Sequence, residues 1–450
     1  MLGVVLAILV TVPEQLVPEL GSFARPVLVG LAWLVFAAAL PLSRHVAPRF
    51  AVPVILTGAV VLPVVAALGI PGSSDDVYRY IWDGRMQAAG IDPYEHPPAA
   101  TDLVGLRDPS LWPEHSAWCV APGDRSSQGE PLAAGCTLIN RPAVHTIYPP
   151  AAQAYFLLIH LFSPTGSLAR PFQLAGAAFA IATTLALFFS TRSRNADPRS
   201  VVTWAWCPAV AIEAGNNAHV DAVSTFLTAM ALLCLSRPRP AGLQLAGGGL
   251  LGLAAATKLT PLLVLPALMR RRPILATSIV VGVIVALYVP HLLRVGPDVL
   301  GYLPGYLAEE GYSSGSRFAL LTLVIPAPWA GAVAVSVLAA IALFVGRTTD
   351  PDRPWIGAAT MTGAALLVTT PAYAWYALLL VLMIGFARGE ARGRQGLWET
   401  RTVWLTVVAA GYVAQYSRLL HIDGRVAERL GYGFALVAIA VAWQLNRRRA

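Results

Sequence analysis

Apolar and polar residues alternate along this chain in long blocks. Apolar runs of roughly 17–25 residues, the length of a helix that crosses a bilayer, recur from one end to the other. They predict membrane spans at 2–16, 26–42, 50–70, 172–190, 200–213, 220–236, 273–292, 326–346, 355–371, 372–387, 402–417 and 430–446. The run at 2–16 has no basic region before it and no clear cleavage site, so we interpret it as a span and not as a signal peptide.

Two shorter apolar segments, 241–257 and 259–269, lie between these spans with basic residues on both sides of the pair. A single crossing cannot have both of its ends on one side of the membrane. We therefore expect a hairpin of two short helices that is broken at 258–261. The whole pattern predicts an all-α polytopic membrane protein with about 12–14 membrane helices.

Short loops between the predicted spans carry most of the arginines, as the positive-inside rule describes for the cytoplasmic side. These arginines are Arg44, Arg49, Arg192, Arg194, Arg199, Arg237, Arg239, Arg270, Arg271, Arg272, Arg347, Arg353, Arg388, Arg392, Arg394, Arg401, Arg447, Arg448 and Arg449. The longest polar region, 71–171, then falls on the outer side. A loop of that length is usually functional.

The resulting division of the chain has five parts. It predicts N-terminal membrane helices at 1–70, an extracytoplasmic catalytic loop at 71–171, a central membrane module at 172–292, a second outer loop at 293–317 and C-terminal membrane helices at 318–450. Within the first outer loop, 147–162 is apolar, but a crossing there would move Arg192 to the outer side. We expect an amphipathic helix on the outer surface instead.

The composition agrees with this class. Of the 450 residues, 56% are hydrophobic and 12% are charged, and the mean hydropathy is +0.62. Soluble domains usually have about 25% charged residues. The net charge of +8 comes from loop arginines, so the expected partner is the lipid bilayer and not a nucleic acid.

Two of the four cysteines, Cys119 and Cys136, fall in the long outer loop. On the oxidising side of the membrane a pair at this spacing predicts a disulfide, which stabilises a loop by about 3 kcal/mol. Two free thiols are the alternative. Cys207 and Cys234 fall in apolar segments, where packing is the simplest role.

The first chemical candidate is the pair Asp75 and Asp76, directly outside the span 50–70. A carboxylate there could act as a general base towards an acceptor hydroxyl, or ligate a metal. The alternative is a helix N-cap, and capping explains one of the two. It does not explain Arg79 and Asp83, which follow at helical spacing, and ionisable residues at membrane positions are functional candidates by default.

The second candidate is Lys258, the only lysine among 32 basic residues. It lies at the expected outer tip of the broken hairpin. An ammonium group there suits a phosphate. The alternative is a side chain that extends to the membrane interface without a ligand.

A third candidate is the segment 213–221 at an outer turn, where Asn217, His219 and Asp221 can hydrogen-bond a sugar or phosphate. A polar turn between two helices is the alternative. His219 and Asp221 are also too few to indicate a metal site. The outer aromatic cluster that contains Tyr376 is either an interfacial belt or a platform for sugar rings.

These segments together resemble a known family. The sequence DxxRYxWDG at 76–84, GIDPY at 90–94, TIYPP at 146–150, and the segments 204–221 and 256–266 resemble the polyprenyl-phosphate-sugar-dependent GT-C glycosyltransferases. Within them the chain is most similar to bacterial α-mannosyltransferases of the actinobacterial lipomannan type. The resemblance covers about 50–320. The catalytic outer loop follows the third predicted span here, whereas the superfamily usually has it after the first.

The resemblance implies a GT-C-like bundle and a mechanism. A sugar on a polyprenyl phosphate, with mannose favoured, is transferred to a hydroxyl of a glycan or glycolipid acceptor with inversion. Asp76 is implied as the base, with Asp75 second. The implied phosphate-binding residues are Lys258, Arg79 and Arg317, and those lining the sugar or acceptor site are Tyr148, Asn217, His219, Asp221 and Tyr376.

The resemblance also implies a multi-pass protein of the bacterial inner (plasma) membrane, with its active site on the extracytoplasmic side of the cell envelope. No cofactor is called for, and a divalent metal is left open. The alternative function is a membrane lipid or solute transporter or flippase. Transporters often have internal repeats, and we find none in this sequence.

Overall fold

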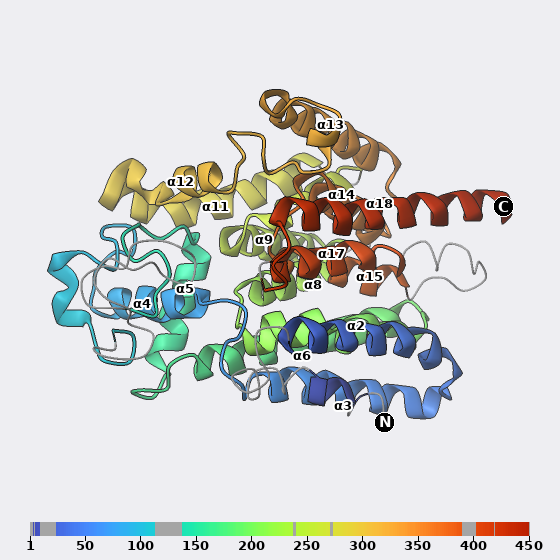
Figure 1. Ribbon diagram of the computed structural model, residues 1–450, viewed down its shortest axis with the longest axis horizontal. Coiled ribbons are helices and arrows are strands. Elements are labelled where there is room, and N and C mark those ends of the chain that lie inside the picture. The colour runs from blue at the N-terminus through green and yellow to red at the C-terminus, as the bar shows by residue number, and fades with distance from the viewer. Residues whose placement is uncertain are drawn as a thin grey trace.

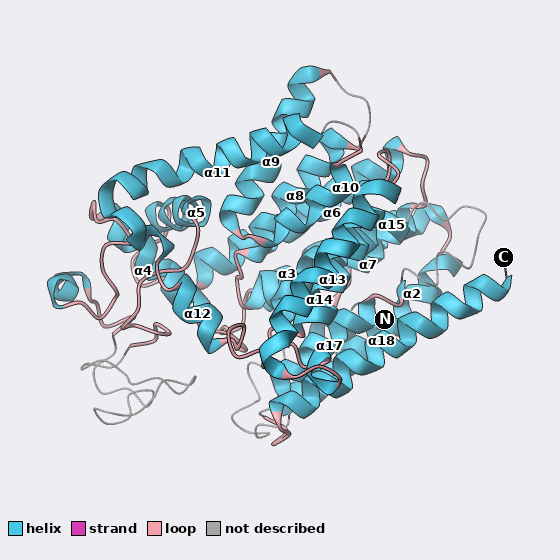
Figure 2. Cartoon of the chain, turned by 90° about the horizontal axis from the view of Figure 1, so that it is seen from above, coloured by secondary structure: helices cyan, strands magenta, loops and turns pink. Residues whose placement is uncertain are grey.

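The computed structural model describes residues 3, 5–9, 24–112, 137–236, 240–270, 273–388, 402–417 and 419–449. Within these residues every regular element is helical, as Figures 1 and 2 show. The α-helices are α2 (Ala24–Leu42), α3 (Pro48–Ala66), α4 (Asp76–Ala88), α5 (Pro150–Leu161), α6 (Arg170–Ser193), α7 (Val202–Ala205), α8 (Asp221–Leu235), α9 (Ala241–Thr257), α10 (Leu265–Leu268), α11 (Pro273–Val295), α12 (Leu303–Glu309), α13 (Ala327–Thr348), α14 (Pro354–Thr369), α15 (Leu378–Arg388), α17 (Leu405–Tyr416) and α18 (Gly424–Arg449).

Several of these helices have the length and composition of membrane spans. Six pass on both criteria, in the regions of α2, α3, α6, α11, α13 and α18, and a bent pair at 210–235 makes a seventh. Five shorter apolar helices accompany them. The prediction of an all-α polytopic membrane protein is therefore confirmed.

One predicted span, 200–213, is wrong as a single helix. The chain there forms a 3₁₀ turn (Pro198–Val201), the short helix α7 and a π-helix (Val210–Asn216). The π-helix then meets α8 at an angle of 116°. Pro208 lies between α7 and the π-helix and has no backbone N–H, so an α-helix cannot run through this point without losing a hydrogen bond.

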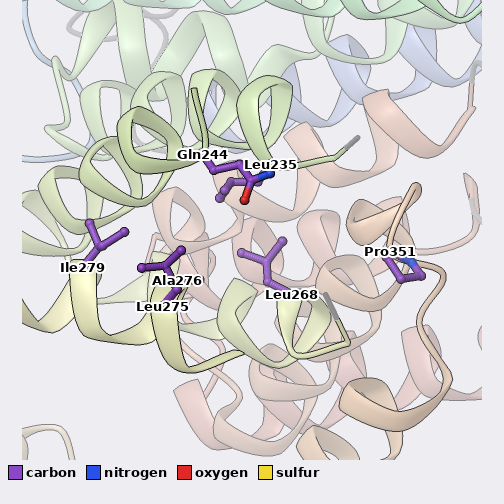
Figure 3. A pocket seen from close by; sticks show the side chains of 7 residues that line it. All are labelled: Leu235, Gln244, Leu268, Leu275, Ala276, Ile279 and Pro351. Carbon is purple, nitrogen blue, oxygen red and sulfur yellow. The ribbon is translucent and has the colours of Figure 1, made fainter. Parts of the chain in front are cut away.

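The expected hairpin of 241–257 and 259–269 is present. α9 ends at Thr257, and the chain returns through a 3₁₀ turn (Thr260–Val264) and α10. Leu235 and Gln244, before and at the start of the hairpin, line one small cavity with Leu268 at its end (Figure 3). Both ends of the hairpin therefore lie at the same end of the bundle, and Lys258 lies at its tip.

The bundle has two chemically different ends. Arg199 donates to the Arg44 carbonyl at 2.6 Å, and Arg194 donates to the Asp352 carbonyl at 3.2 Å. We call this the basic end, made by the turns and helix ends that contain Arg44, Arg194, Arg199, Arg270 and Arg388. α4 and α5 lie at the opposite end (Figure 1).

We call α4, α5 and the described loops at 71–75, 89–112 and 137–149 the cap. α5 packs along α4, with the Tyr80 and Phe156 rings stacked at 4.4 Å. Gly84 makes this approach possible, because a Cβ there would lie 2.6 Å from the Phe156 carbonyl oxygen. α5 is therefore held by α4 within the cap, and its expected place on the outer membrane surface stays a prediction.

Candidate active site

The two adjacent carboxylates lie at the start of α4. Asp76 is its first residue and Asp75 its N-cap position, where the helix dipole favours negative charge. The Asn140 amide donates to both, at 2.9 Å to Asp75 and 2.7 Å to Asp76. Burial, followed by the Asp76 charge, raises the pKa of Asp75 to about 6. Asn140 therefore holds together two groups that repel each other.

Two asparagines of the 213–221 segment fix the loop that leads to these carboxylates. Asn217 accepts from the Gly72 and Ser73 amides at 3.2 and 3.1 Å. Its own amide nitrogen donates to the Ser73 hydroxyl at 2.6 Å and to Glu213 at 2.9 Å. Asn216 accepts from Gly72 at 3.0 Å. The oxygen and the nitrogen of the Asn217 side-chain amide are thus both hydrogen-bonded within the protein. Asn217 therefore holds the loop in place.

His219 lies between two carboxylates from different elements. Its Nδ1 is 3.6 Å from Asp76 Oδ2, and its Nε2 is 3.4 Å from Glu213 Oε2. The ring stacks on Trp375 with centroids 4.1 Å apart and planes at 23°. The bend after the π-helix makes this possible, because it turns the chain back towards α4 at Ala218, which has a left-handed φ of 55°.

Lys258 enters the same group of residues from the hairpin tip. Its Nζ lies 3.1 Å from Asp221 Oδ2, at the start of α8. The ammonium also lies 5.9 Å from the Tyr148 ring centroid and 5.3 Å from that of Tyr376. Asp76 is a second negative charge that acts on Lys258. The lone lysine is therefore paired and faces aromatic rings, and does not simply extend to an interface.

Tyr148 lies between Lys258 and Asp76. Burial, and next the Asp76 charge, raise the pKa of its hydroxyl well above the ordinary value, so it stays protonated as a hydrogen-bond donor. The motif GIDPY supports it, since the Tyr94 hydroxyl donates to the Tyr148 carbonyl at 2.6 Å.

A second aromatic and charged group adjoins Lys258. The Tyr306 and Tyr376 hydroxyls are 2.6 Å apart, joining α12 to the turn before α15. Arg317 is 7% exposed and forms an ion pair with Glu310. Arg317, Glu310 and Asp221 are charged neighbours of Tyr376. The Arg317 Nε is buried without a hydrogen-bond partner among the described residues.

Arg79 is placed differently from the other expected phosphate contacts. Its Nε donates to Asp83 at 3.0 Å, and its terminal nitrogens donate to the Arg141 and Val144 carbonyls at 3.4 and 3.1 Å. Asp83 also accepts from Thr146 at 2.6 Å. All three guanidinium nitrogens of Arg79 therefore donate hydrogen bonds within the cap. Arg79 and Asp83 lie one helical turn apart, so they pair with each other and stabilise the cap.

Asn140 and Glu213, which hold the carboxylates and the imidazole of the site, were not named individually as site residues from the sequence. Asn140 carries no sequence signal, because it meets α4 only through the fold. Glu213 did carry one: it is an acidic residue in an otherwise apolar run, 0% exposed, and such residues are functional candidates.

Cys119 and Cys136 lie outside the described residues, so their pairing stays a prediction. Cys207 is buried, as a packing role requires. Within the described ranges, no group of three or more His, Cys, Asp or Glu side chains is arranged to hold a metal ion.

Comparison with known families gives two matches. The family model of glycosyltransferase family 87 matches residues 146–371, half of the chain. The chain belongs to glycosyltransferase family 87. Residues 8–118 match a model described as the N-terminal domain of an alpha-(1->6)-mannopyranosyltransferase family. Neither curated proteins nor solved structures gave a significant match.

Together the two matched regions contain most of the group described above. Asp75 and Asp76 lie in the mannopyranosyltransferase match, and Tyr148, His219 and Lys258 in the family 87 match. The resemblance found in the sequence is therefore confirmed at the level of the family. With its apolar helices, this protein is a membrane-embedded glycosyltransferase.

Proposed function

We propose that this family 87 protein transfers mannose from a polyprenyl-phosphate donor to a hydroxyl of a glycan or glycolipid acceptor. The observation that carries the proposal is the convergence of a carboxylate, Asp76, and an ammonium group, Lys258, on the ring of Tyr148. Transfer from such a donor needs both: a base for the hydroxyl proton and a cation for the phosphate that leaves.

Asp76 is the base in this proposal. It lies near His219, Tyr148 and Lys258, and Asn140 donates to it at 2.7 Å. The acceptor hydroxyl gives its proton to Asp76 as its oxygen attacks the anomeric carbon. The bond to the phosphate breaks on the opposite side, so a single displacement inverts the anomeric centre.

The leaving phosphate is received by Lys258 and, on the other side of the Tyr306–Tyr376 pair, by Arg317. As negative charge develops on the phosphate, a preorganised cation stabilises it more than it stabilises the bound donor. Tyr306 and Tyr376 lie between the two cations and offer hydroxyl groups to phosphate oxygens. His219 and Asp221 line the sugar side.

Two further elements of the proposal are the sugar and the side of the membrane. Mannose is supported by the match to a mannopyranosyltransferase domain. The outer side is supported by the arginines of the basic end, which the positive-inside rule assigns to the cytoplasm. A Cys119–Cys136 disulfide, recovered by non-reducing mass mapping, would add support; two free thiols would contradict it.

The test is a transfer assay with purified protein in nanodiscs and a panel of polyprenyl-phosphate sugars. We expect release of polyprenyl phosphate and a product of inverted anomeric configuration, read by NMR, with polyprenyl-phosphate mannose as the best donor. Release from none of the donors, together with movement of a labelled lipid between leaflets, would favour the transporter instead. Transfer with a nucleotide sugar alone would contradict the donor class.

A further inference from the structure

Glu213 is a buried carboxylate that the mechanism so far does not use. It is 0% exposed and lies in the π-helix (Val210–Asn216), in an apolar segment where a charge is costly unless it is paired. It accepts from the Tyr412 hydroxyl at 2.7 Å and from Asn217 at 2.9 Å. Irregular π turns of this kind often mark functional sites.

The remaining neighbour of this carboxylate is His219. The imidazole lies between Glu213, 3.4 Å from Nε2, and Asp76, 3.6 Å from Nδ1. Both ring nitrogens are buried and make no hydrogen bond in the described part of the chain. The stack on Trp375 at 4.1 Å fixes the ring plane, so neither nitrogen can turn to another partner without breaking this contact.

We propose that His219 and Glu213 form a proton relay behind the base. This inference rests on the proposed function. Asp76 takes the hydroxyl proton of the acceptor and passes it to His219 Nδ1, which restores the Asp76 carboxylate. The Glu213 carboxylate stabilises the imidazolium through the Nε2–H until the product has left, and the proton then returns through Asp76 to water. Charge balances at each step, because one proton moves and no other group is consumed.

Asp76 is the catalytic residue in this scheme, and His219 and Glu213 are positioning residues that act through it. Their role differs from holding the loop, which Asn217 already does through Ser73. A loop anchor needs hydrogen-bond acceptors only. A relay needs a negative charge at Glu213, 3.4 Å from Nε2, to stabilise the imidazolium when it forms.

Glu213→Gln separates the two roles, since it keeps the size and the acceptor oxygen but removes the charge. The charged groups that face His219 are Asp76 of α4, Glu213 of the π-helix, Asp221 of α8 and Lys258 after α9. Losing one negative neighbour lowers the proton affinity of the imidazole. We therefore expect kcat/KM to fall about tenfold or more and its acid limb to move to lower pH by about 1 unit or more.

The pH profile is measured in the Asp75→Asn background as well, because Asp75 titrates at about 6 and would contribute its own limb. Glu95→Gln is the matched control. It alters another carboxylate–imidazole pair, Glu95 with His96 in the cap at 3.8 Å, which lies outside the His219 cluster. The control is expected to leave both rate and limb unchanged.

His219→Gln is the second variant, and it is measured alone if Glu213→Gln does not fold. We expect it to lower kcat/KM and to remove the acid limb of the imidazole; where Glu213→Gln folds, the double variant should be no slower than His219→Gln alone. Two results would overturn the relay: a slower enzyme whose acid limb has not moved, or rate losses of the two substitutions that are fully additive. Glu213 would then only hold Asn217 and the 72–73 loop in place. If wild-type protein transfers no sugar, the proposed function itself has failed, which is a different result.

Discussion

The basic end and the cap end of this protein both bury charge, but they hold it differently. At the basic end Arg388 is 3% exposed and donates to the Thr203 hydroxyl at 2.7 Å and the Leu40 carbonyl at 2.9 Å. Arg199 likewise donates to the Arg44 carbonyl. These arginines satisfy backbone carbonyls near helix ends, which have no partner within their own helix.

At the cap end, charged groups from separate elements face each other. His219 meets Asp76 and Glu213, and Lys258 meets Asp221. The His219 ring is only 1% exposed, so water does not reach it, and its nitrogens have no hydrogen bond among the described residues. Buried clusters in which opposite charges from separate elements meet are typical of functional sites, whereas a buried cation held by a backbone carbonyl and a hydroxyl group stabilises the fold. The predictions below test this distinction.

The largest effect is expected from Asp76→Asn. The amide keeps an acceptor for Asn140 but cannot take a proton, so transfer should fall by about 10²–10⁴-fold with the thermal stability retained. Sugar transfer and melting temperature are measured in the same nanodiscs. The control is Asp102→Asn, an exposed carboxylate of the cap. Normal transfer in Asp76→Asn with loss in Asp75→Asn would move the base by one residue.

Lys258→Met comes next. A charged hydrogen bond contributes about 1.5–3 kcal/mol, so its loss should weaken donor affinity by roughly ten- to hundredfold. Lys258→Arg should retain part of the affinity, because arginine also binds phosphate. The double variant Lys258→Met with Asp221→Asn corrects for the carboxylate left unpaired. Unchanged donor binding in all three would remove the phosphate role.

Arg388→Met tests the other end. It leaves the Leu40 carbonyl and the Thr203 hydroxyl without their donor, which should cost about 1–3 kcal/mol of stability and lower the melting temperature. Transfer per folded molecule should stay the same. Arg353→Met, which alters an exposed pair with Asp350, should change stability by less than about 1 kcal/mol. A loss of kcat in Arg388→Met would show that the two ends are not separate in function.

The last variant is Asp75→Asn, whose expected effect is on stability alone. Because the pKa of Asp75 is raised from 3.8 to about 6, ionising it costs folded-state stability, and that cost grows as the pH rises from about 4 to 6. The amide removes the cost, so the melting temperature should rise at pH 7.5 and rise less at pH 4.5. Equal shifts at both pH values would mean that the charge of Asp75 is not responsible.

Much of the fold follows from apolar periodicity. The predicted spans at 326–346, 355–371 and 402–417 correspond to α13, α14 and α17, and the break at Lys258 is where α9 ends. Long apolar runs must form helices in a bilayer, because no other local structure satisfies their backbone there. The run at 200–213 departs from this pattern, since proline and tertiary packing interrupt its helix.

The site was predicted only in part. Asp75, Asp76, Lys258 and His219 could be found because ionisable residues beside apolar runs are unusual. Arg79 gave the same signal, and its contacts in the structure are internal ones with Asp83 and two carbonyls. Sequence shows that a charge is present near a membrane helix but not whether another side chain already neutralises it.

The sequence alone determined that the chain is a helical membrane protein and which charges it carries at helix ends, because bilayer length and the cost of charge act on local composition. Only the tertiary structure decided which charges meet. Asn140 reaches Asp75 and Asp76 across 64 or 65 positions of the chain, and Tyr412 reaches Glu213 across 199. Such contacts depend on helix packing and on the 116° bend, which no local pattern encodes.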